Sequence, residues 1–281
     1  PRAAGARLRG PRDDPLELLL GGGARSVVAL DLSVQALEVR HRVLEPRERR
    51  PESRVQPVDH DPEVPRDLLE RPHDEPAPGA TVDLLSFNKQ FLARASYSPT
   101  SQIRARVWTF EDEPVDKEFF RKRIRSAIVS RSMFQVSGSS NAGRLIYAES
   151  DNIPGLIVDR YNDVLVLQSL TVGSEYWKET FADLLLEETG LSTIYERSDA
   201  DVRELEGLEP KVGLLRGSIL HEPLTITENG LQFKVNLAEG HKTGFYLDQR
   251  MNRLRVRELA KDKDVLDCFC YTGGFTVNAL A

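Results

Sequence analysis

The sequence predicts an α/β protein that is built from several units. Three observations lead to this class. Short apolar runs separated by turn residues predict strands between residues 80 and 110, and alternating strands and amphipathic helices follow between residues 113 and 222. Close to the carboxyl end, an apolar run that ends in an acid precedes a glycine pair and another apolar segment, which predicts a strand, a tight turn and a helix.

Composition excludes several classes of protein. No apolar run is long enough to span a membrane, and the first residues lack the apolar core of a signal peptide, so we expect a cytoplasmic protein. Cys268 and Cys270 alternate along one strand end, so a disulfide is not expected, and a metal site would need more ligands. The net charge of −6 argues against a protein that coats nucleic acid by bulk attraction. Nothing in the composition decides between a monomer and an oligomer.

Residues 1–78 differ in composition from the rest of the chain. They hold eleven of the sixteen prolines and contain no aromatic residue. Such a segment can bury little apolar surface, so we expect it to be largely irregular. The sharp change of composition at residue 79 also suggests that this segment has a different origin.

Residues 79–112 are expected to form part of a small β-barrel. Apolar runs at 80–85 and 91–95 predict a hairpin, and alternation over 102–110 predicts another strand. Basic residues interleave with aromatic residues here, and such a stripe can neutralise phosphates while its rings stack on bases. From the spacing alone, an ordinary solvated strand face with core aromatics is slightly favoured. The candidate RNA-binding residues are Lys89, Arg94, Arg104 and Arg106.

Residues 113–222 predict a central α/β module. Apolar residues at helical spacing indicate a helix over 116–132, whose basic residues are expected on a solvated outer face rather than against RNA. Two apolar runs joined at 161–163 predict a hairpin, which a helix over 175–188 and a strand over 193–197 follow. Charged residues near the strand ends are expected to form structural ion pairs. They include Asp159, Arg160, Glu196, Arg197, Asp199 and Arg203.

The last predicted unit consists of residues 223–281. Its first strand is followed by a loop and then by a helix that Asp248 is expected to cap. Met251, Leu254 and Leu259 lie near one face of that helix, which predicts its buried side. The strand, glycine turn and helix described above complete the unit.

Two segments of this unit resemble one family of enzymes. Gly240–Arg250 (GHKTGFYLDQR) and Val265–Phe275 (VLDCFCYTGGF) resemble the S-adenosylmethionine (SAM) domain of the ribosomal RNA large subunit methyltransferase I family. The resemblance runs from about residue 79 to the end, and residues 95–108 resemble the last part of the family's PUA domain, an RNA-binding β-barrel. It implies a partial PUA-like barrel, a central module and the start of a Rossmann-like SAM methyltransferase domain. The opening strand of the family's barrel is not recognisable before residue 79, which leaves barrel closure open.

The resemblance implies a SAM-dependent enzyme that methylates C5 of a cytosine in large-subunit ribosomal RNA. In the family, a cysteine thiolate attacks C6, SAM gives its methyl group to C5, and a base removes the C5 proton. The family's cysteine and its Asp-Pro-Pro motif lie downstream of the glycine turn, and neither occurs in these 281 residues. No catalytic residue is therefore assigned, and we expect the chain to be incomplete and inactive alone, with weak or absent binding of SAM. Cys268 and Cys270 are expected to be buried small hydrophobes rather than substitutes for the nucleophile.

The resemblance also implies which residues hold SAM. Glycine lets the backbone approach a ligand closely, and Asp267 ends a strand at the edge where open α/β sheets bind their ligands. The residues expected to bind the cofactor are Tyr246, Gln249, Arg250, Asp267, Tyr271, Gly273, Gly274 and Phe275. The first three could equally be scaffold contacts.

One island within the first 78 residues looks like the family's next SAM-domain element. Residues 26–30 predict a strand that ends at Asp31, and a helix follows as far as Glu38. In such folds an acid at the end of the second strand binds the ribose hydroxyls, so Asp31 could complete the site in a permuted arrangement. A helical segment that packs elsewhere is favoured over this arrangement.

Two other functions remain open. A non-catalytic RNA-binding module, built on the barrel and the central module, is the main alternative and would bind ribosomal RNA without methyl transfer. A nicotinamide dinucleotide enzyme is poorly supported, because Tyr271–Phe275 lacks the spaced third glycine of that fingerprint.

Overall fold

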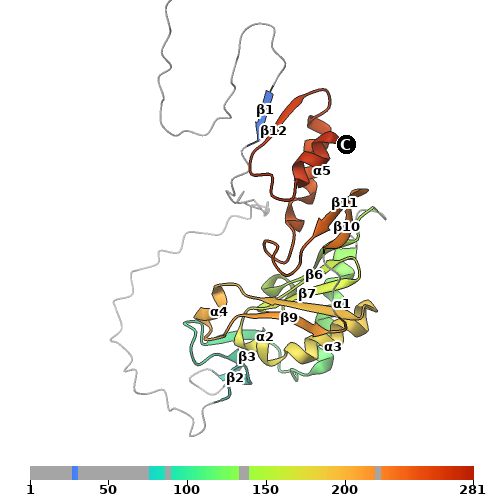
Figure 1. The fold of residues 1–281 in the computed structure, drawn as a ribbon. Helices are drawn as coiled ribbons and strands as arrows, with labels where there is room; N and C mark the ends of the chain where they lie inside the picture. The colour runs from blue at the N-terminus through green and yellow to red at the C-terminus, as the bar shows by residue number, and fades with distance from the viewer. Residues whose placement is uncertain (1–26, 31–75, 86–89, 133–138, 219–222) are drawn as a thin grey trace, which may run out of the picture.

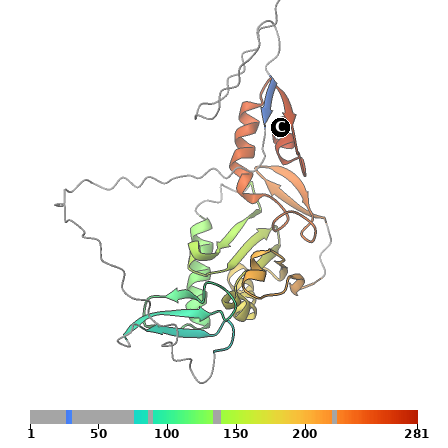
Figure 2. The same cartoon turned by 90° about the vertical axis from the view of Figure 1, so that its left-hand side faces the viewer.

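The structure is a computed structural model, and it describes residues 27–30, 76–85, 90–132, 139–218 and 223–281. The α/β class is confirmed: mixed helices and strands are arranged in separate small sheets along the chain (Figure 1). Figure 2 shows the strands between residues 81 and 109 and the last helices at opposite ends of the molecule, with the central sheet between them.

The predicted barrel segment forms an antiparallel sheet in the order β2-β3-β4. The hairpin and the third strand confirm the alternation in the sequence. Trp108 on the last strand is almost fully buried, and its ring meets that of Phe120 edge-on at 5.1 Å between centroids. This contact joins the sheet to the central module. The strands are β2 (Thr81–Leu85), β3 (Phe91–Tyr97) and β4 (Ala105–Thr109).

The central module is a five-stranded sheet in the order β5-β6-β7-β8-β9. Only the β7/β8 pair is parallel, and helices α2 and α3 form the crossover that parallel pairing requires. The strands are β5 (Ala142–Tyr147), β6 (Leu156–Tyr161), β7 (Val164–Ser169), β8 (Thr193–Ser198) and β9 (Lys211–Arg216). The helices are α1 (Lys117–Ser132), η2 (Ala148–Asp151), α2 (Val172–Tyr176), α3 (Lys178–Thr189) and α4 (Val202–Leu205).

Both faces of the central sheet are buried along β7, which explains its continuous apolar sequence. Leu165 and Leu167 belong to the core beneath α1 and α3. Val164 and Val166 alternate with them and face a second core, which includes Phe245. The loop that the family resemblance links to the cofactor therefore packs directly on the central module.

The last unit begins with a hairpin whose turn, Asn229-Gly230, has two positive φ angles of 49° and 79°. This is the turn that a two-residue hairpin favours, and glycine adopts it without steric cost. The hairpin strands are β10 (Leu224–Glu228) and β11 (Leu231–Val235). The later elements are η3 (Leu247–Gln249), α5 (Arg250–Leu259), β12 (Asp264–Asp267) and α6 (Gly274–Leu280).

Strand β1 (Val27–Leu30) lies beside β12 in a parallel pair (Figures 1 and 2). The register places Val27 opposite Asp264 and Leu30 opposite Asp267. The strand of the predicted island thus occupies the edge of the last sheet, as the less favoured permuted arrangement requires. Asp31 and the predicted helix after it lie outside the described residues.

Two predictions about α5 are wrong. Asp248 does not cap the helix, because it pairs with Lys242 at 3.0 Å and the cap position falls on Gln249, which makes no side-chain cap. The predicted apolar face is not the buried one, since Met251 and Leu259 are both 58% exposed. The buried residues of this helix are Arg253 and Val256. An arginine occupies the interior because Glu228 neutralises its charge there.

Candidate functional site

The glycine turn after β12 is open. Gly273 has a φ of 71°, and a side chain added there would meet no atom of the described structure within 4 Å. Phe269 and Tyr271 also have positive φ angles, 63° and 50°, in a region that L-residues rarely adopt. Phe269 is 87% exposed. Backbone strain of this kind concentrates at ligand sites, and here it lies next to Gly273, which has open space beside it in the described structure.

Asp267 ties the strand to the helix after the turn. Its Oδ2 accepts hydrogen bonds from the backbone N–H of Thr276 at 3.1 Å and from the Thr276 hydroxyl at 2.6 Å. No described residue donates to the other oxygen, Oδ1. One carboxylate oxygen therefore holds the local structure while the other can accept a hydrogen bond from a ligand hydroxyl.

An aromatic cluster joins the glycine turn to the loop before α5. The His241 backbone N–H donates to the Tyr271 hydroxyl at 2.9 Å, and the two rings lie 4.5 Å apart between centroids. The His241 Nδ1 lies 3.0 Å from the Tyr246 hydroxyl, and the rings of Tyr246 and Tyr271 meet edge-on at 5.8 Å. The structure thus brings together two predicted cofactor residues through His241, which the sequence reasoning did not assign.

Arg253 contacts Tyr246, Gly274 and Phe275, three of the residues predicted to bind the cofactor. Its side chain donates to the Tyr246 carbonyl at 2.9 Å, and its guanidinium lies 6.0 Å from the centre of the Phe275 ring. A side chain at Gly274 would come within 3.1 Å of the Arg253 Cδ, so the glycine allows this close approach. Arg253 was missed because a charged side chain gives no sign of burial in the sequence.

Gln249 and Arg250 lie at the start of α5 and are half-buried. Gln249 accepts a hydrogen bond from the Asn252 side chain at 2.7 Å, which is a contact within the helix start. Among the described residues, no hydrogen bond links either of them to the glycine turn. Their role in cofactor binding stays a prediction.

Cys268 and Cys270 follow β12 as free thiols, and both are exposed. The prediction that they are buried is wrong, because the strand ends at Asp267 and its neighbours already belong to the turn. The described part of the chain contains no cluster of ligands suited to a metal ion.

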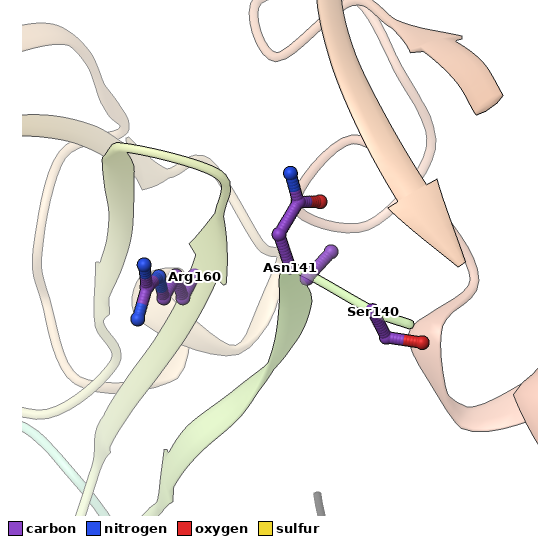
Figure 3. A pocket seen from close by; sticks show the side chains of 4 residues that line it. Ser140, Asn141 and Arg160 are labelled. Atoms are coloured by element: carbon purple, nitrogen blue, oxygen red, sulfur yellow. The ribbon is translucent and has the colours of Figure 1, made fainter. Parts of the chain in front are cut away.

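A small pocket lies away from the glycine turn. It has a volume of about 100 Å³ and is lined by Ser140, Asn141, Ala142 and Arg160 at one end of the central sheet (Figure 3). Sites for ligands of cofactor size usually exceed about 300 Å³, so this pocket is too small for SAM. The chemistry of the glycine turn, rather than this hollow, defines the candidate site.

Most of the predicted RNA-binding residues that the structure describes are engaged with acids. Arg94 pairs with Asp83 at 2.9 Å and with Asp112 at 2.7 Å. Arg106 donates to the buried Glu206 at 2.9 Å. These contacts agree with the interpretation of the stripe as an ordinary strand face.

Arg104 differs from the other arginines of the stripe. It is exposed, lies 5.5 Å from the centre of the Tyr97 ring and donates to the Tyr97 hydroxyl at 2.9 Å. No carboxylate pairs with it among the described residues. Lys89 lies outside the described residues.

Comparison with known families assigns two parts of the chain. Residues 211–281 match the S-adenosylmethionine-dependent methyltransferase family, and residues 59–110 match a PUA-like domain. Both matches start earlier than the boundaries predicted at residues 223 and 79. No helix within the described ranges is both long and apolar enough to cross a membrane.

Curated relatives carry the name Ribosomal RNA large subunit methyltransferase I. The protein of Vibrio cholerae serotype O1 is 49% identical over 205 residues, which make up 73% of this chain and 52% of the relative. That of Vibrio campbellii is 47% identical over 206 residues, with the same coverage. This chain spans about half the length of the curated relatives that it matches.

Solved structures share the fold. The crystal structure of SMU.776 complexed with SAH gives a TM-score of 0.63 at 24% identity, over 73% of this chain and 52% of that chain. A second solved chain, from Streptococcus mutans, gives a TM-score of 0.61 at 24% identity and covers 74% of this chain. At this identity the likeness supports the fold.

Proposed function

We propose that this chain, which is homologous to the ribosomal RNA large subunit methyltransferase I family, supplies the SAM-binding turn and RNA-binding elements of an enzyme that forms 5-methylcytosine in large-subunit ribosomal RNA. The observation that carries this proposal is the open, strained turn at Gly273, next to an Asp267 oxygen that no described residue occupies. A ribosomal RNA substrate places the protein in the cytoplasm.

The residues around the turn fit SAM. The aromatic rings of Tyr246 and Tyr271 offer apolar surface, and Asp267 Oδ1 offers an acceptor for a hydroxyl group. SAM, when bound, supplies an activated methyl group for transfer to a nucleophilic carbon. The chain's own residues would hold it beside β12, close to the exposed Phe269.

The PUA-like segment supports an RNA substrate. Its sheet is tied to the central module through Trp108, and Arg104 presents a guanidinium with no acidic partner on an exposed strand end. Arginine and aromatic side chains of this kind can contact phosphate and stack on bases. Methylation at cytosine C5 is the finer part of the proposal and comes from the family resemblance.

A charge-removing substitution at the strand end tests cofactor binding. Asp267→Asn retains an acceptor for Thr276 and removes the carboxylate charge, whereas Asp264→Asn makes the same change at the exposed start of the same strand. Saturation-transfer NMR with SAH detects weak binding. We expect a signal for the unaltered chain and for Asp264→Asn, and a weaker one for Asp267→Asn. Equal signals from both variants would remove Asp267 from the site.

The product tests the rest of the proposal. Because the chain alone is expected to be inactive, it is joined to the part of the Vibrio cholerae relative that it does not match. Large-subunit ribosomal RNA is incubated with this fusion and methyl-labelled SAM, and bisulfite sequencing then locates any 5-methylcytosine. Label at cytosine C5 supports the proposal, and label on another atom contradicts the C5 assignment. Salt-dependent RNA binding without transfer favours the non-catalytic RNA-binding module.

A further inference from the structure

A buried chain of hydroxyl groups connects the central sheet to the loop before α5. Thr243 on this loop is 1% exposed, and its hydroxyl lies 2.6 Å from Asp159 Oδ2 and 2.8 Å from the Tyr161 hydroxyl. Asp159 and Tyr161 are two residues apart on β6 and therefore point to the same face. Side chains from two units of the protein thus meet in one hydrogen-bonded group.

The direction of these bonds follows from counting protons. A hydroxyl has one proton to donate, and the carboxylate of Asp159 can only accept, so Thr243 donates to Asp159. Tyr161 then donates to the Thr243 oxygen and accepts from the Phe245 backbone N–H at 3.1 Å. Loss of the Thr243 hydroxyl would remove one buried hydrogen bond from Asp159 and one from Tyr161. Asp159 would keep its bonds from Arg144, and Tyr161 would keep the Phe245 carbonyl, which lies 3.3 Å from its hydroxyl.

Asp159, which accepts the hydrogen bond from Thr243, is also held by an arginine of the neighbouring strand. Arg144 donates to Asp159 through Nε at 2.8 Å and through Nη2 at 2.9 Å, and the two residues are cross-strand partners on β5 and β6. Burial raises the pKa of the Tyr161 hydroxyl, and the Asp159 charge adds to this effect, so Tyr161 remains a proton donor. The Tyr161 hydroxyl therefore keeps its proton, and Arg144 fixes the position of the Asp159 carboxylate.

A second contact holds the start of the loop. Arg197, on β8, donates to the carbonyl groups of Leu237 and Gly240, and it is itself paired with Asp199. Side chains of the central sheet thus hydrogen-bond to the loop at Gly240 and again at Thr243 and Phe245. His241 lies between these two hydrogen-bonded positions, and Tyr246 follows directly after the second. Both side chains contact Tyr271 beside the glycine turn.

We propose that Thr243, together with Tyr161 and Asp159, is a positioning unit that sets the place of His241 and Tyr246 against the glycine turn and so shapes the cofactor site. The inference rests on the proposed function. A purely apolar contact would fill this space at lower desolvation cost, whereas a polar chain with fixed donors and acceptors specifies one position of the loop.

A set of variants separates positioning from general stability. Thr243→Val keeps the side-chain volume and removes the hydroxyl, whereas Thr243→Ser keeps the hydroxyl. Tyr161→Phe removes the phenol hydroxyl that bonds to Thr243 and Phe245. Thr171→Val is the matched control, because Thr171 is also a buried threonine whose hydroxyl is hydrogen-bonded, at the cap of α2.

The first measurement needs no ligand. Amide hydrogen exchange by NMR follows the N–H groups of His241 and Phe245, which donate to Tyr271 and Tyr161. We expect exchange to become about tenfold faster in Thr243→Val and in Tyr161→Phe, as the loss of a buried hydrogen bond implies. Thr243→Ser should restore exchange close to that of the unaltered chain, and Thr171→Val should leave these two amides unchanged.

The second measurement is the affinity for SAH, which should fall in Thr243→Val and recover in Thr243→Ser. If the unaltered chain does not bind SAH, the proposed function fails, but the amide measurement still decides whether the unit positions the loop. Unchanged exchange at both amides in Thr243→Val and Tyr161→Phe would overturn the proposal. Equal acceleration in Thr171→Val would also overturn it, since the effect would then be general loosening.

Discussion

Arg253 on α5 and Glu228 on β10 form a buried bidentate ion pair, with N–O distances of 2.6 and 2.7 Å and side chains that are 2% and 3% exposed. The guanidinium also lies 4.5 Å from the centre of the Phe245 ring. One arginine thus links the hairpin, the helix and the loop that carries the aromatic cluster.

Removal of one partner of this pair should strongly destabilise the last unit. Arg253→Met leaves the Glu228 carboxylate buried and unpaired, and a loss of about 3–5 kcal/mol in the free energy of unfolding is expected. Arg255→Met on the same helix is the control, because its pair with Glu258 is exposed and should be worth less than about 1 kcal/mol. Urea denaturation measures both, and equal losses would show that the buried pair has no special weight.

The stability of the central module should depend on the ionisation of Glu175. Burial opposes its charge, but hydrogen bonds from Lys178, Lys211 and Arg203 outweigh burial and lower its pKa from 4.5 to about 2. A lowered pKa in the folded state means that the stabilisation is complete above pH 4.5 and is lost as the pH falls towards 2.

The measurement is the free energy of unfolding at pH 6 and pH 3. For Glu175 alone, linkage gives a loss of about 2 kcal/mol over this range, which Glu175→Gln should remove from the pH dependence. Glu239→Gln, at an exposed position, should keep the dependence of the unaltered chain. The same slope in all three proteins would contradict this role of Glu175.

The pairing of β1 with β12 should protect the backbone of β12. Successive backbone N–H groups of a strand point to opposite sides, so one of the two at Val28 and Ala29 points towards β12. Proline at both positions removes both N–H donors and therefore the one that faces β12. We expect faster amide exchange in β12 and a greater tendency to aggregate, because an unpaired strand edge accepts other chains. Threonine at the same two positions retains the donors and should preserve protection. Unchanged exchange in the proline variant would mean that this pair forms no stable sheet.

Arg104 should matter more for RNA binding than Arg94. Arg104→Gln removes a guanidinium that no described carboxylate neutralises, so the salt slope of binding to ribosomal RNA fragments should fall by about one. Arg94→Gln removes a charge already paired with Asp83 and Asp112, and it should change affinity less. Filter binding at several salt concentrations compares them. The opposite order would indicate that the acids around Arg94 release it when RNA binds.

The sequence predicted the elements whose apolar pattern had one clear period. The β6–β7 hairpin and helix α1 agree with the residues that the sequence indicated. The strand expected over residues 233–237 is β11, which begins and ends two residues earlier. The Arg197–Asp199 pair also confirms the expected ion pairing. Local pattern was sufficient there because helical spacing marks α1, and short apolar runs on either side of turn residues mark β6 and β7.

The candidate site was only partly predictable. Tyr246 and Tyr271 do meet edge-on, and His241 hydrogen-bonds to both of them. The two segments are far apart in sequence, so local pattern does not reveal this contact. The buried face of α5 could not be predicted, because Arg253 is interior only when Glu228 lies opposite it. Long-range ion pairs of this kind override helical periodicity, and nothing in a single sequence marks them.

The place of β1 has a further consequence for how the chain reaches its native state. Residues 27–30 are synthesised before every other described element, whereas their partner strand, residues 264–267, follows the whole central module. Closing so long a loop is entropically slow compared with forming neighbouring hairpins. The last strand should therefore wait with open backbone groups while the central module is already folded. Refolding at low protein concentration should then recover more native protein than refolding at high concentration, since crowded chains would compete for the same strand edge.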